Sequence, residues 1–286
     1  MLCYFCFAGV NVRLMSDTGI KISDKMNPYL LSYTPADITY EISVKKCDKL
    51  PETRAAFYKS GTAHYELTET GKRVFLSKDP FSEPYALVEF YGNKRTGLSY
   101  LSGNESMFDS TTALFHKIGF ENMLLDCNRV ILHCSYILCK GKSVLFSAPS
   151  ETGKSTQARL WRDFYGAEII NDDRAAISVS DDVCHSHGVP FSGTSDICNN
   201  LSSRIGAIIV LRQGKQNEIS RLNKTEAFFH LYSETTIHQW DKSYVEKASA
   251  VLLDVIENTP VYMLTCLPDK DAADLLYQTL IDGGVF

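Results

Sequence analysis

Several features that assign a chain to a specialised class are missing from these 286 residues. No hydrophobic run approaches the ~20 residues of a membrane-spanning helix, so we expect no membrane insertion. No basic cluster is present and the net charge is −5, which leaves no electrostatic attraction for nucleic acid or an anionic membrane. The sequence also has no low-complexity tract and no internal repeat, and 44% of its residues are apolar. This is the composition of a globular protein with one large domain or two small ones.

The cysteine pattern of a disulfide-linked secreted protein is also missing. The nine cysteines are an odd, scattered number, and several lie in apolar runs, as reduced core thiols do. Cys3 and Cys6 form a C-x-x-C pair without a second pair at zinc-like spacing, so we interpret them as strand residues. The apolar first segment has no basic region and continues into the alternating residues 10–14, which favours a β-strand over a signal peptide. We expect a cytoplasmic protein.

The most informative segment is 142–174. An apolar run is followed by the loop Ala148-Pro149-Ser150-Glu151-Thr152-Gly153-Lys154-Ser155, a helix, a second apolar run and Asn171-Asp172-Asp173-Arg174. Gly-Lys-Ser at a helix start is the phosphate-binding half of a P-loop, whose backbone N–H groups hold phosphate oxygens. This order of elements predicts a nucleoside triphosphate site. The expected nucleotide-binding residues are Ser150, Glu151, Thr152, Gly153, Lys154, Ser155 and Thr156, with Lys154 on the terminal phosphates and Ser155 on Mg²⁺.

Two positions depart from the pattern G-x-x-x-x-G-K-[ST]. Ala148 occupies the first glycine position, and Glu151 lies in the middle of the loop. A carboxylate about 4 Å from a phosphate costs roughly 1 kcal/mol in water and about 4 kcal/mol at a half-desolvated surface. A positive φ at a non-glycine residue would add about 1–2 kcal/mol. Alternatively, Glu151 points to solvent and Mg²⁺ neutralises the charge that faces it.

The first half of the chain has the pattern of a β-rich region. Residues 38–44 alternate between apolar and polar, and 74–76 and 85–90 are short apolar runs between proline and glycine turn signals. This half contains no recognisable catalytic constellation. We therefore assign residues 1–105 to a β-rich N-terminal region with a role in support, substrate recognition or oligomer contact.

Residues 106–286 have a mixed α/β pattern. We expect helices from 109 or 110 to 118, over 242–257 and over 269–280, and strands at 175–179, 207–211 and 261–265. Residues 129–139 and 142–146 form a predicted hairpin about Lys140-Gly141, which pairs positions whose numbers sum to 281. That register places His133 opposite Ala148, at the mouth of the phosphate loop. The whole chain is thus predicted to be a mixed α/β protein with a P-loop nucleotide-binding domain at 106–286.

Four groups of residues are candidates for chemistry. Asp172 and Asp173, on opposite faces of an extended segment, could hold Mg²⁺ and accept a proton, or could cap a strand end. His133 is either a core histidine or a ligand of metal or substrate beside the phosphates. The loop from Gly188 to Thr194 is either a second anion or acceptor site or a plain surface loop. Candidates to neutralise transition-state charge are Arg174, Arg204, Arg212 and Arg221.

The chain resembles the superfamily of HPr kinase/phosphorylases and phosphoenolpyruvate carboxykinases. The matching residues are Leu132-His133-Cys134-Ser135, the hairpin with Val144-Leu145-Phe146, the loop from Pro149 to Thr156, and Asn171 to Arg174. The resemblance covers about residues 128–215, and the N-terminal half looks like that of small HPr kinase-like bacterial proteins.

This resemblance implies specific roles. Lys154 would bind phosphates, Ser155 and one of Asp172 and Asp173 (in our assignment Asp173) would bind Mg²⁺, and the other Asp would serve as base. His133 would lie at the metal or the acceptor, and HPr kinases are oligomers, so a homo-oligomer is compatible with the likeness. Ala148 and Glu151 stand where the loops of that superfamily have glycine.

We expect an ATP-dependent kinase that transfers the γ-phosphoryl group to a hydroxyl of a protein, peptide or small molecule, with ATP and Mg²⁺ as cofactors. The alternative is a nucleotide-binding regulatory module with little or no turnover, which Ala148 and Glu151 motivate. A phosphoenolpyruvate carboxykinase-type decarboxylase is the third hypothesis, although the chain is short for the organic-acid site of that enzyme.

Overall fold

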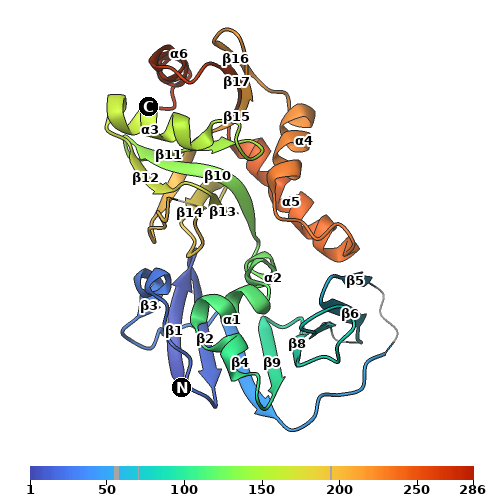
Figure 1. The fold of residues 1–286 in the computed structure, drawn as a ribbon. Coiled ribbons are helices and arrows are strands. Elements are labelled where there is room, and N and C mark those ends of the chain that lie inside the picture. The colour runs from blue at the N-terminus through green and yellow to red at the C-terminus, as the bar shows by residue number, and fades with distance from the viewer. Residues whose placement is uncertain (55–57, 70, 194) are drawn as a thin grey trace. The chain divides into compact units, whose positions relative to one another are not determined.

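The computed structural model describes residues 1–54, 58–69, 71–193 and 195–286, which form two compact units (Figure 1). Unit 1 is Met1–Cys127 and unit 2 is Asn128–Phe286. The division therefore lies after Cys127 and not at the predicted 105/106 boundary. The reason is that two helices in this stretch pack on the N-terminal sheet, where the rings of Phe115 and Phe120 lie 5.0 and 5.1 Å from that of Phe7.

Unit 1 contains, within its described residues, a nine-stranded sheet of order β3-β1-β2-β4-β9-β8-β7-β6-β5. Strand β4 pairs in parallel with β2 and β9, and the other neighbours are antiparallel. The strands are β1 (Leu2–Phe7), β2 (Val10–Ser16), β3 (Leu30–Leu31), β4 (Tyr40–Cys47), β5 (Tyr58–Ser60), β6 (Ala63–Leu67), β7 (Lys72–Leu76), β8 (Ala86–Phe90) and β9 (Arg95–Leu101). The predicted strands of the N-terminal half are confirmed.

The two faces of this sheet differ, as the period-two pattern of its strands requires. Val10, Val12 and Leu14 of β2 are fully buried on the inner face, while Arg13 and Met15 lie on the outer face. The helices α1 (Thr111–Lys117) and α2 (Phe120–Asp126) cover the inner face, together with the 3₁₀ helices η1 (Asp24–Tyr29) and η2 (Glu105–Phe108). The predicted helix start is confirmed, because the Ser110 hydroxyl accepts from the backbone N–H of Ala113.

The described part of unit 2 forms an eight-stranded sheet. The start of the long strand β15 pairs with β14, and the rest of β15 pairs with β11 on one side and β17 on the other. The first half of β10 pairs with β13, and its second half pairs with β11 on one side and β12 on the other. The strands are β10 (Arg129–Cys139), β11 (Lys142–Ser147), β12 (Glu168–Asn171), β13 (Arg174–Ser180), β14 (Val183–His187), β15 (Ser202–Gln213), β16 (Glu218–Arg221) and β17 (Val261–Cys266).

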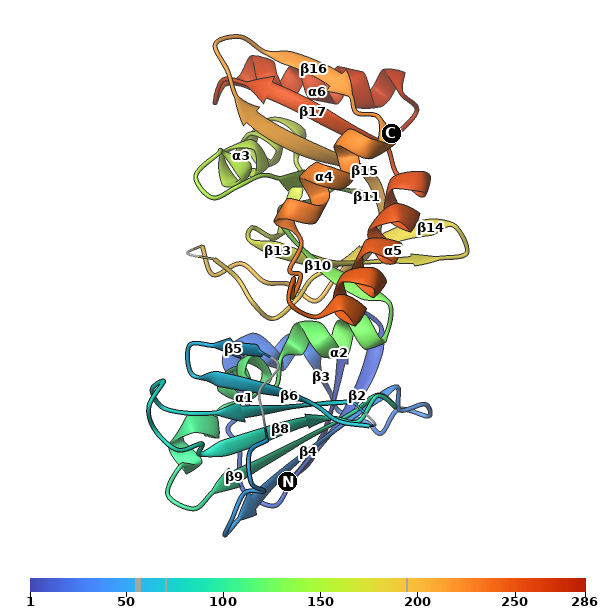
Figure 2. The same ribbon diagram turned by 90° about the vertical axis from the view of Figure 1, so that its right-hand side faces the viewer.

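The helices of unit 2 bury one face each against this sheet (Figure 2). They are α3 (Lys154–Tyr165), α4 (Lys224–Glu234), α5 (Lys242–Asn258) and α6 (Lys270–Asp282). Trp161 of α3 and Leu276 of α6 are fully buried in one core with Phe146 of β11. The predicted helices over 242–257 and 269–280 are confirmed as α5 and α6, whereas α4, β14 and β16 were not predicted. No helix in the described ranges is long and apolar enough to cross a membrane.

The hairpin of β10 and β11 has the predicted register. Cys134 pairs with Ser147 and Cys139 with Lys142, so the paired numbers sum to 281. Lys140 and Gly141 have φ of 48° and 78°, the geometry that a tight two-residue hairpin turn needs. The pair of Cys134 and Ser147 is one step from His133 and Ala148, and the Ser147 hydroxyl donates to the His133 carbonyl at 3.1 Å. The hairpin therefore brings His133 to the start of the loop of residues 148–153, the predicted phosphate loop.

Candidate functional site

The loop of residues 148–153 joins the end of β11 to the start of α3. β11 lies between β10 and β15 and runs parallel to β15, so the loop lies at the carboxyl edge of the parallel strands β11, β15 and β17. Ligands of open α/β sheets bind at this edge. Gly153 has φ of 119° and directly precedes α3, a conformation that side chains rarely adopt. The predicted strand–loop–helix geometry is thus present.

Lys154 is folded into the loop. Its ammonium Nζ donates to the carbonyl oxygens of Ala148 at 2.7 Å and Pro149 at 3.1 Å, and the residue is only 7% exposed. Burial lowers the pKa of Lys154, and the nearby Glu234, Cys134 and Asp173 oppose that shift. The side chain therefore lies between the loop and two carboxylates. An anionic ligand that binds there would contact an ammonium group that burial has already desolvated.

Ala148 and Glu151 differ in their strain. Ala148 is buried and is not among the non-glycine residues with positive φ, so the backbone accommodates it. Glu151 is exposed and has φ of 65°, a left-handed conformation that costs a side-chain-bearing residue about 1–2 kcal/mol. Its carbonyl oxygen accepts from the Gln213 side chain at 3.2 Å. The loop thus needs at position 151 the geometry that glycine supplies without cost.

His133 lies between two carboxylates. Its Nδ1 is 2.9 Å from Oε2 of Glu234, and its Nε2 is 3.9 Å from Oδ1 of Asp173. The side chain is 30% exposed, so it is not a fully enclosed core histidine. Asp173 in turn forms an ion pair with Arg174 at 2.6 Å. These four side chains form a continuous chain of charged and polar contacts beside the phosphate loop.

The Asp-Asp segment is bent and not extended as we predicted. The cause is Asn171, whose buried side chain accepts from the backbone N–H groups of Asp173 and Arg174 and donates to the carbonyls of Val189 and Phe191. Asp173 consequently faces His133 and Arg174. Oδ1 of Asp172 is buried without a hydrogen-bond partner among the described residues.

The buried Oδ1 of Asp172 is a candidate ligand of the predicted Mg²⁺. Mg²⁺ takes oxygen ligands and in phosphate sites keeps waters and one or two carboxylates, so an unpaired Asp172 oxygen and the Ser155 hydroxyl fit it chemically. In the described ranges, no group of three or more His, Cys, Asp or Glu side chains is arranged to hold a metal. A metal would therefore depend on phosphate oxygens for part of its coordination, as in P-loop proteins.

The loop that begins at Gly188 also reaches this region. A Cβ built on Gly193 would lie 3.3 Å from Cβ of Asp173, so Gly193 is in direct contact with Asp173. Thr194, the last residue of the predicted loop, lies outside the described residues. Among the four candidate arginines, Arg174 lies in the site through Asp173, whereas Arg212 donates to the Thr265 hydroxyl at the strand surface.

Glu234 is the site residue that the sequence analysis missed. It is the last residue of α4, and the backbone just after it contacts β10, since Thr236 N–H donates to the Ile131 carbonyl at 2.9 Å. The capping box of Asn223 and Glu226 marks the start of α4 in the sequence. No signal in the sequence shows which strand the end of that helix meets.

A pocket of about 350 Å³ adjoins the phosphate loop. One side consists of Glu151, Thr152, Gly153, Thr156 and Gln157 of the loop and α3, and the other consists of the ends of β15 and β17 and the residues that follow them. The walls facing the loop are Gln213, Gly214, Cys266, Leu267 and Pro268. Its size is at the lower end of the range for small-molecule sites. The sequence analysis named Glu151, Thr152, Gly153 and Thr156 but not Gln157 or the five residues that face the loop.

Comparison with known proteins gave distant structural likenesses and no sequence match. No protein-family model matches the chain, and no curated protein matches it in sequence. Among solved structures, the chain is similar to the HPr(Ser) kinase/phosphatase from Coxiella burnetii, with a TM-score of 0.31 and 12% sequence identity. That match covers 54% of this chain and 95% of the other.

Proposed function

We propose that unit 2 binds ATP with Mg²⁺ and transfers the γ-phosphoryl group to a hydroxyl of a protein, peptide or small molecule. The observation that carries the proposal is the position of Lys154. It begins α3 after the loop that follows the parallel strand β11, and Asp173 and Glu234, the two carboxylates that flank His133, oppose the lowering of its pKa by burial. A lysine at a helix start near a carboxylate that could accept the proton of a hydroxyl supports phosphoryl transfer to a hydroxyl.

Each group has a role in this proposal. Backbone N–H groups of residues 150–156 and the N-terminus of α3 hold the phosphates, and Lys154 exchanges its two loop carbonyls for phosphate oxygens. Mg²⁺, held by Ser155 and Asp172, would supply charge neutralisation on the transferred group. Asp173 would accept the proton of the incoming hydroxyl, with His133 and Arg174 fixing its orientation. The unpaired oxygen of Asp172 favours this division over the reverse one.

The 350 Å³ pocket beside the loop would hold the nucleoside. It begins at Glu151, Thr152 and Gly153, and its apolar wall of Leu267 and Pro268 suits a base, while Gln157 and Gln213 offer amide groups. ATP is a cytoplasmic metabolite, so the proposal places the protein in the cytoplasm.

A binding module with little turnover is the second candidate. The observation in its favour is Glu151, which lines the nucleoside pocket with a carboxylate and a strained backbone. Such a protein would bind nucleotide without fast transfer, and its response to substitution at position 151 would differ from that of an enzyme.

Calorimetric titration of Mg²⁺-ATP into the wild type and into Lys154→Ala tests the proposal. We expect saturable binding by the wild type and a loss of at least about 100-fold in affinity in the variant, because removing a buried phosphate contact costs about 3 kcal/mol. Lys242→Ala is the matched control, since Lys242 is 91% exposed on α5 and should leave affinity unchanged. Absence of binding to the wild type would overturn the proposal.

A further inference from the structure

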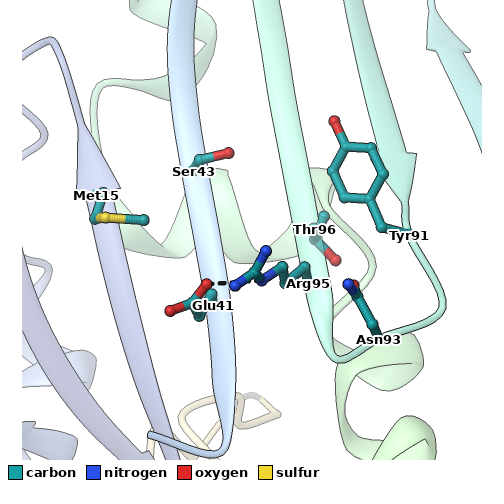
Figure 3. A pocket seen from close by; sticks show the side chains of 7 residues that line it. All are labelled: Met15, Glu41, Ser43, Tyr91, Asn93, Arg95 and Thr96. Atoms are coloured by element: carbon teal, nitrogen blue, oxygen red, sulfur yellow. Dashed lines mark ion pairs between the residues drawn. The ribbon is translucent and has the colours of Figure 1, made fainter.

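The outer face of the unit 1 sheet carries a pocket of about 480 Å³, which the proposed nucleotide site does not use. Its floor is made by β2, β4 and β9, and one wall by the turn between β8 and β9 (Figure 3). The lining residues are Met15, Glu41, Ser43, Tyr91, Asn93, Arg95 and Thr96. A concave site of this volume has the size of a small-molecule pocket.

A row of three charged side chains runs across the outer face, and two of them line the pocket. Arg13 of β2 pairs in register with Glu41 of β4, which pairs in register with Arg95 of β9, so the three lie side by side. Both arginines form ion pairs with the one carboxylate, and Arg95 Nε is 2.8 Å from Glu41 Oε2. Two guanidinium groups thus share one carboxylate. The row carries a surplus of one positive charge, with Glu41 and Arg95 in the pocket lining and Arg13 on the strand beside it.

Hydrogen-bond donors in the pocket remain uncommitted. A guanidinium has five N–H groups, and among the described residues Arg95 uses only its Nε, leaving both terminal nitrogens free at 58% side-chain exposure. The side chains of Ser43 and Asn93 also have no hydrogen-bond partner in the part of the chain that the structure describes, and both line the pocket. Figure 3 shows Asn93 beside Arg95, with Ser43 on the neighbouring strand.

Two apolar groups bound the same space. The ring of Tyr91 lies over Gly97, because a Cβ there would be 2.9 Å from the Tyr91 hydroxyl oxygen. The hydroxyl donates to Glu89 at 3.0 Å, which fixes the ring as a wall. Met15, 36% exposed, lies on the opposite side and offers a flexible thioether.

We propose that this pocket binds a small organic carboxylate whose planar or apolar body lies between Tyr91 and Met15. The free edge of Arg95 matches a carboxylate with two parallel N–H···O bonds, and Asn93 and Ser43 serve its hydroxyl or carbonyl groups. The single surplus charge matches a monoanion. A phosphate monoester carries about −1.5 to −2 charges at pH 7 and would be left under-neutralised.

The test follows the methyl signal of Met15 in full-length protein labelled at its six methionines. The probe is 4-hydroxybenzoate, with the neutral 4-hydroxybenzyl alcohol and inorganic phosphate as comparisons, and Met15→Leu assigns the signal. We expect a saturable shift with the carboxylate and a dissociation constant at least tenfold higher in Arg95→Gln. The buried Met26 and Met123 report that the variant is folded.

Arg162→Gln is the matched control, because it removes an exposed arginine paired with a carboxylate, Asp163, on α3 of unit 2, outside the pocket lining. It should bind the probe as the wild type does. A Met15 shift that persists in Arg95→Gln, or no saturable shift with the carboxylate, would overturn the proposal. Arg95-dependent binding of phosphate that is as tight as that of 4-hydroxybenzoate would overturn the choice of a carboxylate.

Discussion

At the residue scale, Glu151 disfavours the phosphate binding that we propose for the rest of its loop. It holds a left-handed backbone conformation and lines the pocket with a negative charge. Glu151→Gly should raise the free energy of unfolding by about 1 kcal/mol, because glycine adopts this φ without strain. It should also tighten Mg²⁺-ATP binding by at least about fivefold, as removing about 1 kcal/mol of charge repulsion implies. Urea denaturation and calorimetry measure the two effects.

Asp181→Gly separates strain from charge at position 151. Asp181 also has a positive φ, 50°, in the turn between β13 and β14. Asp181→Gly should raise the free energy of unfolding by a similar amount and leave the affinity for Mg²⁺-ATP unchanged. Equal affinity changes in both variants would mean that Glu151 does not face the phosphates. A gain in transfer activity in Glu151→Gly, beyond the gain in binding, would favour an enzyme over a regulatory module.

Glu234 is the second residue whose role can be isolated, and this prediction rests on the proposed function. Glu234→Gln keeps the shape of the contact with His133 Nδ1 but removes its charge. We expect Mg²⁺-dependent ATP hydrolysis to fall about 10–100-fold in kcat, as loss of a supporting contact at a histidine typically does. Affinity for Mg²⁺-ATP should change by less than about threefold, since Glu234 does not line the nucleoside pocket.

Glu257→Gln is the control for this experiment. Glu257 is 54% exposed and pairs with Lys224 at the surface, so hydrolysis should be unchanged. If Glu234→Gln hydrolyses ATP at the wild-type rate, the contact with His133 has no part in the chemistry. If Glu234→Gln lowers the affinity for Mg²⁺-ATP by the same factor as it lowers kcat, Glu234 contributes to binding of the nucleotide in the ground state.

At the element scale, His187 fixes the junction of three strands. On β14, its ring lies between the hydroxyls of Ser178 on β13 and Ser202 on β15, with nitrogen–oxygen distances of 2.9 and 2.7 Å. Burial, with Arg129 and His185 nearby, lowers the pKa of His187 to about 3. The folded protein therefore keeps this ring neutral at pH values where the unfolded chain protonates it.

This difference predicts a loss of stability in mild acid. Between pH 6.5 and pH 3 the unfolded state binds one proton more than the folded state at this site, so the free energy of unfolding falls as pH falls. From pH 7 to pH 5 the loss attributable to His187 should be about 2 kcal/mol. Urea denaturation at the two pH values should show a smaller loss for His187→Gln than for the wild type. An identical loss in both proteins would contradict the neutral, buried ring.

The predicted helices and strands agree with the structure where the local sequence signals are strong. The Lys140-Gly141 turn set the register of β10 and β11, and Asp269 caps α6 through the backbone N–H of Ala272, close to the predicted start. By contrast, α4 and β16 were missed, since β16 is four residues long and much of α4 is exposed. Short or exposed elements lack the apolar periodicity on which such predictions depend.

At the scale of the whole molecule, the division after Cys127 predicts that unit 2 folds by itself. Its core joins β11, β15, α3 and α6, with Phe146, Trp161 and Leu276 fully buried. A fragment of residues 128–286 should show one cooperative thermal transition in circular dichroism. It should also bind Mg²⁺-ATP with the affinity of the full chain, because Lys154, His133 and Glu234 all belong to unit 2. A fragment without a cooperative transition would show that the two units are not independent.

The sequence by itself determined the strand, loop and helix of residues 142–165 and their immediate surroundings. A glycine and a lysine at the start of a helix, after an apolar strand, are local features, and the hairpin register that brings His133 to the loop follows from a two-residue turn. Local backbone preferences act over a few residues, so a single sequence reveals them. The roles of ATP, Mg²⁺ and the Asp pair remain predictions.

Only the tertiary structure decided what meets the loop from a distance. Glu234 lies 101 residues after His133, and Cys266 reaches the pocket from the end of β17. The bend at Asp172 and Asp173 depends on carbonyl oxygens of residues 189 and 191, and the row of Arg13, Glu41 and Arg95 depends on the order of three parallel strands. Such contacts are set by the packing of whole elements, because many distant pairings satisfy the same local pattern and burial of the common core selects one.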